Sequence, residues 1–218
     1  MNIVAPMSEI QPEYAELIQV SFSGGLPSEL ADLRSLREDF QFAQHCANAY
    51  LHLDLVKMND ESRNVVSRAL WVSAAIAYRR GFTTGKAQLV PQGNRLKIPQ
   101  SWFDALKPEG RVAHDEILEI ANKQIAHHTG KHENYNVVAL LMPPPNPRAL
   151  AGVGVISMGL AVPGNERIQH LGELCQSLIN GIDRRIEDLT NEFESFVKAQ
   201  NLDDLYDDPA KVNTKDDA

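Results

Sequence analysis

The sequence predicts a mainly α-helical protein with a small β-hairpin insertion and a long C-terminal helix. Apolar residues recur at steps of three and four over residues 30–55 and 61–80, which is the spacing of amphipathic helices. A heptad-like stripe of the same kind runs through residues 166–200. Between these stretches, residues 136–160 hold two apolar segments on either side of a proline-rich stretch. These patterns together favour a helical bundle that carries one hairpin.

A single helical domain is expected over residues 28–200. With 43% hydrophobic and 23% charged residues, the chain has enough apolar material for its own core. Residues 1–27 mix Pro, Gly and Ser and are expected to form a loosely docked N-terminal arm. Residues 201–218 hold six Asp and two Lys, contribute half of the net charge of -8, and are expected to be a disordered acidic tail.

Two helices are expected in the first part of the domain. Ser28 is a suitable N-cap for the first helix, which is expected to end near Leu55. Asp60 is expected to cap the second helix, which runs to about Arg80 and ends at Gly81. Because its stretch SRALWVSAAIAY is apolar on most sides, the second helix is expected to be the central, most buried one.

A hairpin and a long helix complete the domain. The segments NVVALLM at 136–142 and AGVGVISMGL at 151–160 predict the strands, since the intervening PPPNPR suits only a loop. The last helix is expected over residues 166–200, capped by Asn165. Its apolar stripe consists of Ile168, Leu171, Cys175, Leu178, Ile182, Ile186, Leu189, Phe193 and Phe196. At about 1.5 Å per residue this helix extends past a small bundle, so its far end serves either core packing or a dimer seam.

A histidine-rich stretch follows an irregular loop over residues 83–99 and a short helix over residues 101–106. Four of the seven histidines lie within residues 111–136, which begin as an amphipathic helix. On a helical wheel, His114 and His128 lie away from a narrow polar stripe. That stripe consists of Glu116, Glu119, Lys123 and His127.

His127 is the candidate for acid–base chemistry. The C-terminal end of the helix dipole favours its imidazolium and Lys123 opposes it, a competition that can hold a histidine near neutrality. The alternative is a histidine that merely caps the last carbonyl groups. His127 and His128 point about 100° apart on a helix, so they do not converge on one metal ion. A site formed by His128, His132 and Glu133 is the remaining metal alternative, and we expect no metal and no cofactor.

A basic segment lies between Glu61 and Asp104, where the chain has seven cations and no acidic residue. The cations are Arg63, Arg68, Arg79, Arg80, Lys86, Arg95 and Lys97. The aromatic residues interleaved with them are Trp71, Tyr78, Phe82, Trp102 and Phe103. Such segregation favours a surface for phosphate or RNA, with aromatic rings available for base stacking. The alternative is that the aromatics belong to the core and the cations are ordinary surface groups or pair with the acidic tail.

Composition and spacing disfavour several other classes of protein. Cys46 and Cys175 have no CxxC spacing, so neither a disulfide framework nor a zinc knuckle is expected. A cytoplasmic location is expected for the same reason. No apolar run approaches the roughly 18–20 residues of a membrane span, and the N-terminal residues lack the basic region of a secretory signal. The fragment GFTTGKA is not a phosphate loop, because its glycine spacing is one residue short and Ala87 replaces the magnesium-binding residue.

The stretches ALWVSAAIAYRRGFTTGKA and HDEILEIANKQIAHHT together resemble a group of uncharacterised bacterial proteins. That group has a Tyr-x-Arg-x-Phe helix end followed by a helix reading Arg-Asp/Asn-Lys-x-Ile-Ala-His. It is similar to the HEPN superfamily of all-α proteins, many of which are metal-independent RNases. The matching residues are Tyr78, Arg80 and Phe82, then Asn122, Lys123, Ile125, Ala126 and His127. Ala121 stands where the pattern has Arg, so the resemblance implies a HEPN-like bundle that is catalytically degenerate.

Three hypotheses about function follow from these features. The first is a degenerate HEPN-like protein that binds RNA or a nucleotide phosphate through Tyr78, Arg79, Arg80, Phe82 and Lys86. The second is an active metal-independent RNase with His127 as general acid/base, supported by Lys123, Asn122 and Arg80. The third is a structural partner protein that assembles through the last helix. A homodimer and no membrane partner are expected.

Overall fold

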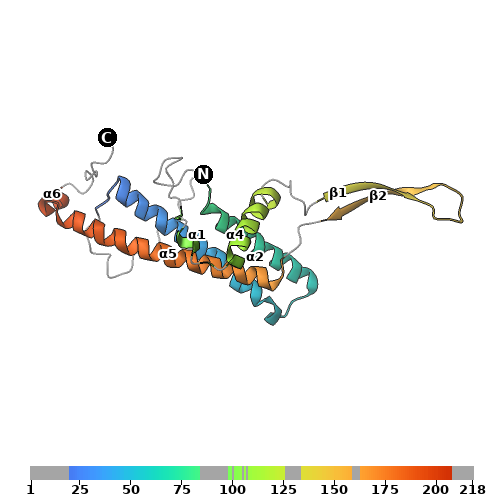
Figure 1. Ribbon diagram of the computed structural model, residues 1–218, viewed down its shortest axis with the longest axis horizontal. Helices are drawn as coiled ribbons and strands as arrows, with labels where there is room; N and C mark the ends of the chain where they lie inside the picture. Colours follow the sequence, from blue (N-terminus) through green and yellow to red (C-terminus); the bar gives the residue numbers. More distant parts are fainter. Residues whose placement is uncertain are drawn as a thin grey trace.

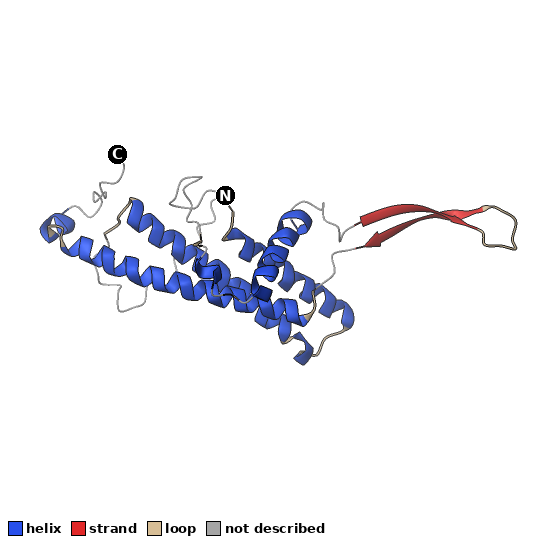
Figure 2. Ribbon diagram, viewed as in Figure 1, coloured by secondary structure: helices blue, strands red, loops and turns tan. Residues whose placement is uncertain are grey.

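The computed structural model describes residues 20–83, 98–99, 101–104, 106, 108–125, 134–158 and 163–207. Helices form an elongated body from which one two-stranded ribbon projects (Figure 1, Figure 2). The ribbon and the short last helix lie at opposite ends of the molecule (Figure 1). The predicted fold class, mainly α with a small hairpin and a long C-terminal helix, is confirmed. No helix in the described part combines the length and apolarity needed to cross a membrane.

Helix α5 (Asn165–Lys198) is the longest described element and contributes more buried residues than any other. Its predicted apolar stripe is buried from Ile168 to Leu189, where every stripe residue is at most 5% exposed. Helix α1 (Gly25–Leu51) packs along α5. Its buried apolar residues are Leu33, Leu36, Phe40, Ala43, Cys46 and Ala47. The core therefore lies mainly between the first and the last long helix of the chain.

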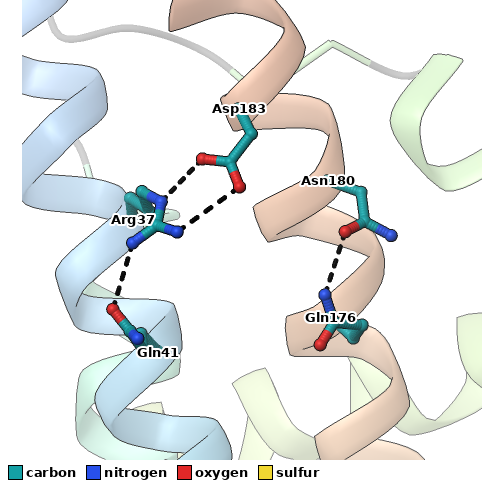
Figure 3. A network of polar contacts seen from close by, with 5 residues as sticks. All are labelled: Arg37, Gln41, Gln176, Asn180 and Asp183. Carbon is teal, nitrogen blue, oxygen red and sulfur yellow. Dashed lines mark hydrogen bonds and ion pairs between the residues drawn. The ribbon is translucent and has the colours of Figure 1, made fainter.

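Polar side chains align α1 with α5 beside this core. Arg37 Nε donates a hydrogen bond to Asp183 Oδ1 at 2.6 Å (Figure 3). Further along, Gln44 Nε2 donates to Gln176 Oε1 at 2.8 Å. Gln176 Nε2 in turn donates to Asn180 Oδ1 (Figure 3). Residue numbers rise along α1 and fall along α5 between these contacts, so the two helices are antiparallel. Because such exposed pairs contribute about 1 kcal/mol or less, they set the register more than the stability.

Helix α2 (Asp60–Arg80) follows α1 after the 3-10 turn η2 (Leu53–Leu55). It is not the central helix that its composition predicts, since Val65 and Ile76 are 65% and 42% exposed. Its buried residues are Trp71, Ala74, Ala75, Ala77 and Tyr78. An alanine-rich face is apolar by count but offers little side-chain area, and the larger residues of α5 provide the central contact instead.

Several helix boundaries differ from those expected. Helix α1 begins before Ser28, with Gly24 as its N-cap, and stops at Leu51 because the chain turns into η2. Asn59 caps α2, and its Oδ1 accepts a hydrogen bond from the backbone N–H of Ser62 at 2.7 Å. Asp60, the expected cap, is the first residue of the helix. There its negative charge interacts favourably with the positive end of the helix dipole. The expected cap of the last helix, Asn165, is likewise its first residue, and Gly164 is the N-cap.

Three short elements pack against α2 and α5. They are α3 (Ser101–Asp104), α4 (Pro108–Ile120) and the π-helical segment η3 (Ala121–Ile125). The predicted ribbon consists of β1 (Asn134–Leu141) and β2 (Leu150–Met158), which pair in antiparallel register. The described part of the chain thus has a helical side layer on the body and a separate ribbon.

Both ends of the described chain are more ordered than the sequence indicates. Phe22 of the predicted loose arm packs on Phe193 and Phe196 of α5, with ring centroids 5.0 and 6.2 Å apart. Residues Leu202–Asp207 of the predicted disordered tail form helix α6, which buries Leu205. Burying one leucine offsets part of the entropy cost of ordering this short acidic stretch. The remainder of the predicted arm and tail lies outside the described residues.

Candidate functional site

The most distinctive polar contact of the body joins α2 to α4. Tyr78, in the last turn of α2, is fully buried, and its hydroxyl lies 2.7 Å from Nδ1 of His114. Burial raises the pKa of the Tyr78 phenol, which therefore keeps its proton. Burial also lowers the pKa of His114, and the Asp115 carboxylate acts in the opposite direction. The phenol donates when Nδ1 is bare and accepts when Nδ1 carries the ring proton.

Aromatic rings surround this pair. The ring centroids of Phe82 and Phe103 lie 4.7 and 4.8 Å from that of His114, and Tyr78 lies 5.9 Å away. Phe40 of α1 packs behind Tyr78, at 5.7 Å. One imidazole nitrogen is thus held by the phenol, and Nε2 has no hydrogen-bond partner among the described residues. The cluster therefore presents a half-buried, neutral imidazole that can donate or accept one further hydrogen bond.

The two arginines at the end of α2 have different partners. Arg79 Nε donates a hydrogen bond to Oδ1 of Asn122 in η3. Arg80 Nη1 lies 2.8 Å from Oδ1 of Asp39, a carboxylate of α1 whose side chain is 10% exposed. The exposed charge of Arg80 is therefore offset by a buried carboxylate. Arg79 instead reaches the residue that directly follows Ala121, where the family pattern has its arginine.

The predicted polar stripe of α4 is engaged in ion pairs. Lys123 Nζ lies 2.9 Å from Glu119 Oε1, one turn earlier. Glu116 Oε2 lies 3.6 Å from Arg167 Nε of α5. His127, the fourth member of the stripe, lies outside the described residues, as does the candidate ligand residue Lys86. The structure thus places Tyr78 and Phe82 beside His114, and it joins Arg79 to Asn122 at the same end of α2.

His114 is a candidate that the sequence analysis set aside, because it lies away from the stripe of His127. A sequence signal was nevertheless present. Ile117 and Ala121 follow His114 by three and seven residues, and both are buried, so His114 lies on the apolar face of its helix. A histidine on such a face destabilises the fold unless a polar group in the core forms a hydrogen bond with it. Tyr78 provides that partner.

Fewer side chains of the basic segment are available to bind a ligand than its composition suggests. Arg63 donates to the backbone oxygens of Leu53 and Val56 and forms an ion pair with Asp54, which fixes the connection between α1 and α2. Trp71 is 3% exposed and so is not available to stack a base. Of the seven predicted cations, Lys86, Arg95 and Lys97 lie outside the described residues.

A cleft lies between α3 and α5. It has a volume of about 470 Å³ and is lined by Glu29, Pro99, Trp102, Gly181, Arg184, Arg185 and Asp188. Arg185 pairs with Glu29 at 2.8 Å, so the lining holds both signs of charge. Within the described ranges, no group of three or more His, Cys, Asp or Glu side chains is arranged to hold a metal ion. The histidines of the sequence-based metal alternative, His128 and His132, are outside those ranges.

The fold and site define an α-helical protein with a projecting ribbon and a tyrosine–histidine cluster at a helix junction. Compared with protein-family models, curated proteins and solved structures, the chain has no significant match. The HEPN-like resemblance therefore stays a prediction based on the two short motifs.

We expect the stability of the protein to fall as the pH is lowered through about 6.5, in part because of His114. Its pKa is lower in the folded state, so the unfolded chain takes up the proton first. The stabilisation is complete above the unfolded pKa and declines as the pH falls towards the folded one. Thermal unfolding of His114→Gln should show a smaller decrease in Tm on acidification than the wild type. His45→Gln, at an exposed position of α1, is the control, and equal decreases in both variants would contradict this role of His114.

Proposed function

We propose that this chain is a catalytically degenerate HEPN-like protein that binds RNA or another phosphate-bearing ligand at the end of α2. The observation that carries the proposal is the hydrogen bond from Arg79 to Asn122. It joins the helix end of the first motif to the second motif. It also brings a guanidinium beside Ala121, the position at which the family pattern has its arginine.

The chemistry of Arg79 suits a phosphate. Its terminal nitrogens have no partner among the described residues, and its side chain is partly exposed. A planar guanidinium can donate two parallel hydrogen bonds to phosphate oxygens, which makes arginine the preferred side chain for this purpose. Arg80 is a weaker candidate for the first contact, because a ligand would compete there with the carboxylate of Asp39. His114 supports the site as a neutral donor or acceptor close to the same helix end.

Binding of a labelled single-stranded RNA at low salt tests the proposal. We expect Arg79→Gln to weaken binding about fivefold, equivalent to about 1 kcal/mol for one charge-assisted contact. The slope of log K against log salt concentration should also decrease by about 0.7, the value for one phosphate contact on a single strand. Arg148→Gln removes the same charge from the exposed ribbon loop and should leave both quantities unchanged. An absence of RNA binding by the wild type at low salt would contradict the proposal.

A metal-independent RNase is the second candidate. The hydrogen bond from Arg79 to Asn122 favours it too, because it brings a guanidinium next to the position at which the family pattern has its arginine. In that case His127 acts as general acid/base, and Arg79 rather than Arg80 stabilises the charge that develops on the phosphorane. The same mixtures separate the two candidates when EDTA is present. Cleavage that is lost in His127→Ala supports the RNase, whereas RNA that is bound and stays intact supports binding alone.

A further inference from the structure

Over residues 137–141 and 153–155, one face of the projecting ribbon carries only apolar, exposed side chains. We call this part of the face the apolar strip, and it consists of Val137, Ala139, Leu141, Val153 and Val155. The side chains of Val137, Leu141 and Val153 are 74%, 71% and 67% exposed. No described helix covers the strip (Figure 1). Exposed apolar side chains that are contiguous, rather than scattered singly, mark an interaction surface.

The strand register places these five side chains together. Val137 pairs with Val155 and Ala139 with Val153, and Leu141 lies two residues after Ala139 on β1. Directly paired residues of antiparallel strands point to the same face, and so do alternate residues of one strand. On the opposite face, Val138 and Leu140 pair with Gly154 and Gly152. Only the strip carries a side chain at every position of both strands.

We propose that the apolar strip is the surface through which two copies of this chain associate, face to face and related by a two-fold axis. A two-stranded ribbon on its own is only marginally stable in water, and further strands or a covering layer are needed to stabilise it. The ribbon of a second copy supplies such a layer. Two sheets stacked in this way lie about 10 Å apart, with their side chains interdigitated.

The chemistry of the ribbon favours a second copy over other occupants. Arg148 is the one charged residue of the sequence from 134 to 158, and it lies in the loop between the strands. The strip therefore offers no charge by which to recognise a nucleic acid or a charged protein. A lipid bilayer is also a poor partner, because the edges of an open ribbon carry unpaired backbone N–H and C=O groups. An uncharged, valine-rich strip is complementary to itself, as an isologous contact requires.

The shape and charge of the molecule are consistent with contact through the ribbon alone. The chain has a net charge of -8, so two bodies repel each other, and the projecting ribbon allows contact away from them (Figure 1). Eight residues of β1 span about 26 Å, and two strands are about 10 Å wide, which gives about 500 Å² for two copies. Stable interfaces bury about 1,200 Å² or more. We therefore expect a reversible dimer whose population depends on concentration.

Sedimentation equilibrium over a wide range of protein concentration tests this dimer. The triple variant Val137→Thr, Val153→Thr, Val155→Thr keeps the β-branched shape but adds hydroxyl groups to the strip. We expect it to weaken dimerisation by at least about tenfold, which corresponds to roughly 1.4 kcal/mol. Val138→Thr with Ile156→Thr, on the opposite face, is the matched control and should dimerise like the wild type. A wild type that is monomeric at every concentration, or equal weakening in both variants, would overturn the proposal.

Cross-linking tests the position of the contact independently of affinity. Val153→Cys places one thiol on the strip, whereas the native Cys46 and Cys175 are buried and have thiol pKa values raised by that burial. Mild oxidation should give a disulfide-linked dimer of Val153→Cys and much less of Val65→Cys, an equally exposed position on α2. Equal yields from the two variants, or binding of the wild type to phospholipid vesicles through the ribbon without dimers, would count against a second copy as the occupant.

Discussion

Phe40→Ala should lower the free energy of unfolding by about 3–5 kcal/mol, the usual cost of removing a fully buried phenylalanine. The Phe40 side chain is 0% exposed. Its ring lies 5.7 Å from that of Tyr78 and 5.9 Å from that of Phe82. It also packs on Gly81, where an added Cβ would lie 2.9 Å from Cε1 of the ring. Removing this ring leaves a cavity behind the Tyr78–His114 pair.

Chemical denaturation of Phe40→Ala measures this loss, and the same helix offers the control. Phe42 is two residues further along α1 and is 53% exposed. Phe42→Ala should change the free energy of unfolding by less than about 1 kcal/mol, since little apolar area leaves the core. Similar losses in both variants would mean that Phe40 is not the main support of the α2 end.

The same substitution should have opposite effects at two glycines of α5. A Cβ on Gly181 would lie 2.7 Å from Cδ2 of Trp102, so Gly181→Ala must displace the indole ring. A Cβ on Gly172 would lie 3.9 Å from Cβ of Ala47, which is an ordinary contact. Overpacking at Gly181 costs about 1–3 kcal/mol. This cost outweighs the roughly 1 kcal/mol by which alanine is more favourable than glycine in a helix. Gly172→Ala should instead stabilise the protein by up to about 1 kcal/mol.

Denaturation and tryptophan fluorescence together check this pair of variants. We expect Gly181→Ala to unfold at lower denaturant concentration and to shift the emission of Trp102, whereas Gly172→Ala unfolds later with unchanged emission. Trp71, the other tryptophan, is 3% exposed on α2 and serves as the internal reference. Stabilisation by both substitutions would show that α3 does not pack on α5 through Trp102.

The proposed ligand site and the proposed dimer contact can fail separately. Arg79 and Asn122 lie on the helical body, and the apolar strip lies on the projecting ribbon (Figure 1). Loss of dimerisation in the strip variant with unchanged RNA binding would separate the two surfaces. Loss of RNA binding in both the strip variant and Arg79→Gln would instead show that the ligand is recognised by the dimer.

The sequence by itself determined the elements whose signal is local. The stripe from Ile168 to Leu189 predicted the buried face of α5, because a helix exposes one side chain to the same neighbour every three or four residues. The apolar segments around PPPNPR predicted the ribbon in the same way, since β-branched residues and proline restrict the backbone locally. These patterns depend on residues close together in the chain. They can therefore be recognised without knowing which element packs against them.

Only the tertiary structure decided which residues meet. Nothing in the periodicity of α2 or α4 pairs Tyr78 with His114, or Arg79 with Asn122, because these partners are 36 and 43 residues apart. The tertiary packing likewise gave α5 rather than α2 the larger buried face and left the ribbon with no described helix over it. Burial and the pKa of a side chain depend on what other elements bring against it. A histidine that looked peripheral on its own helix therefore became the polar centre of the candidate site.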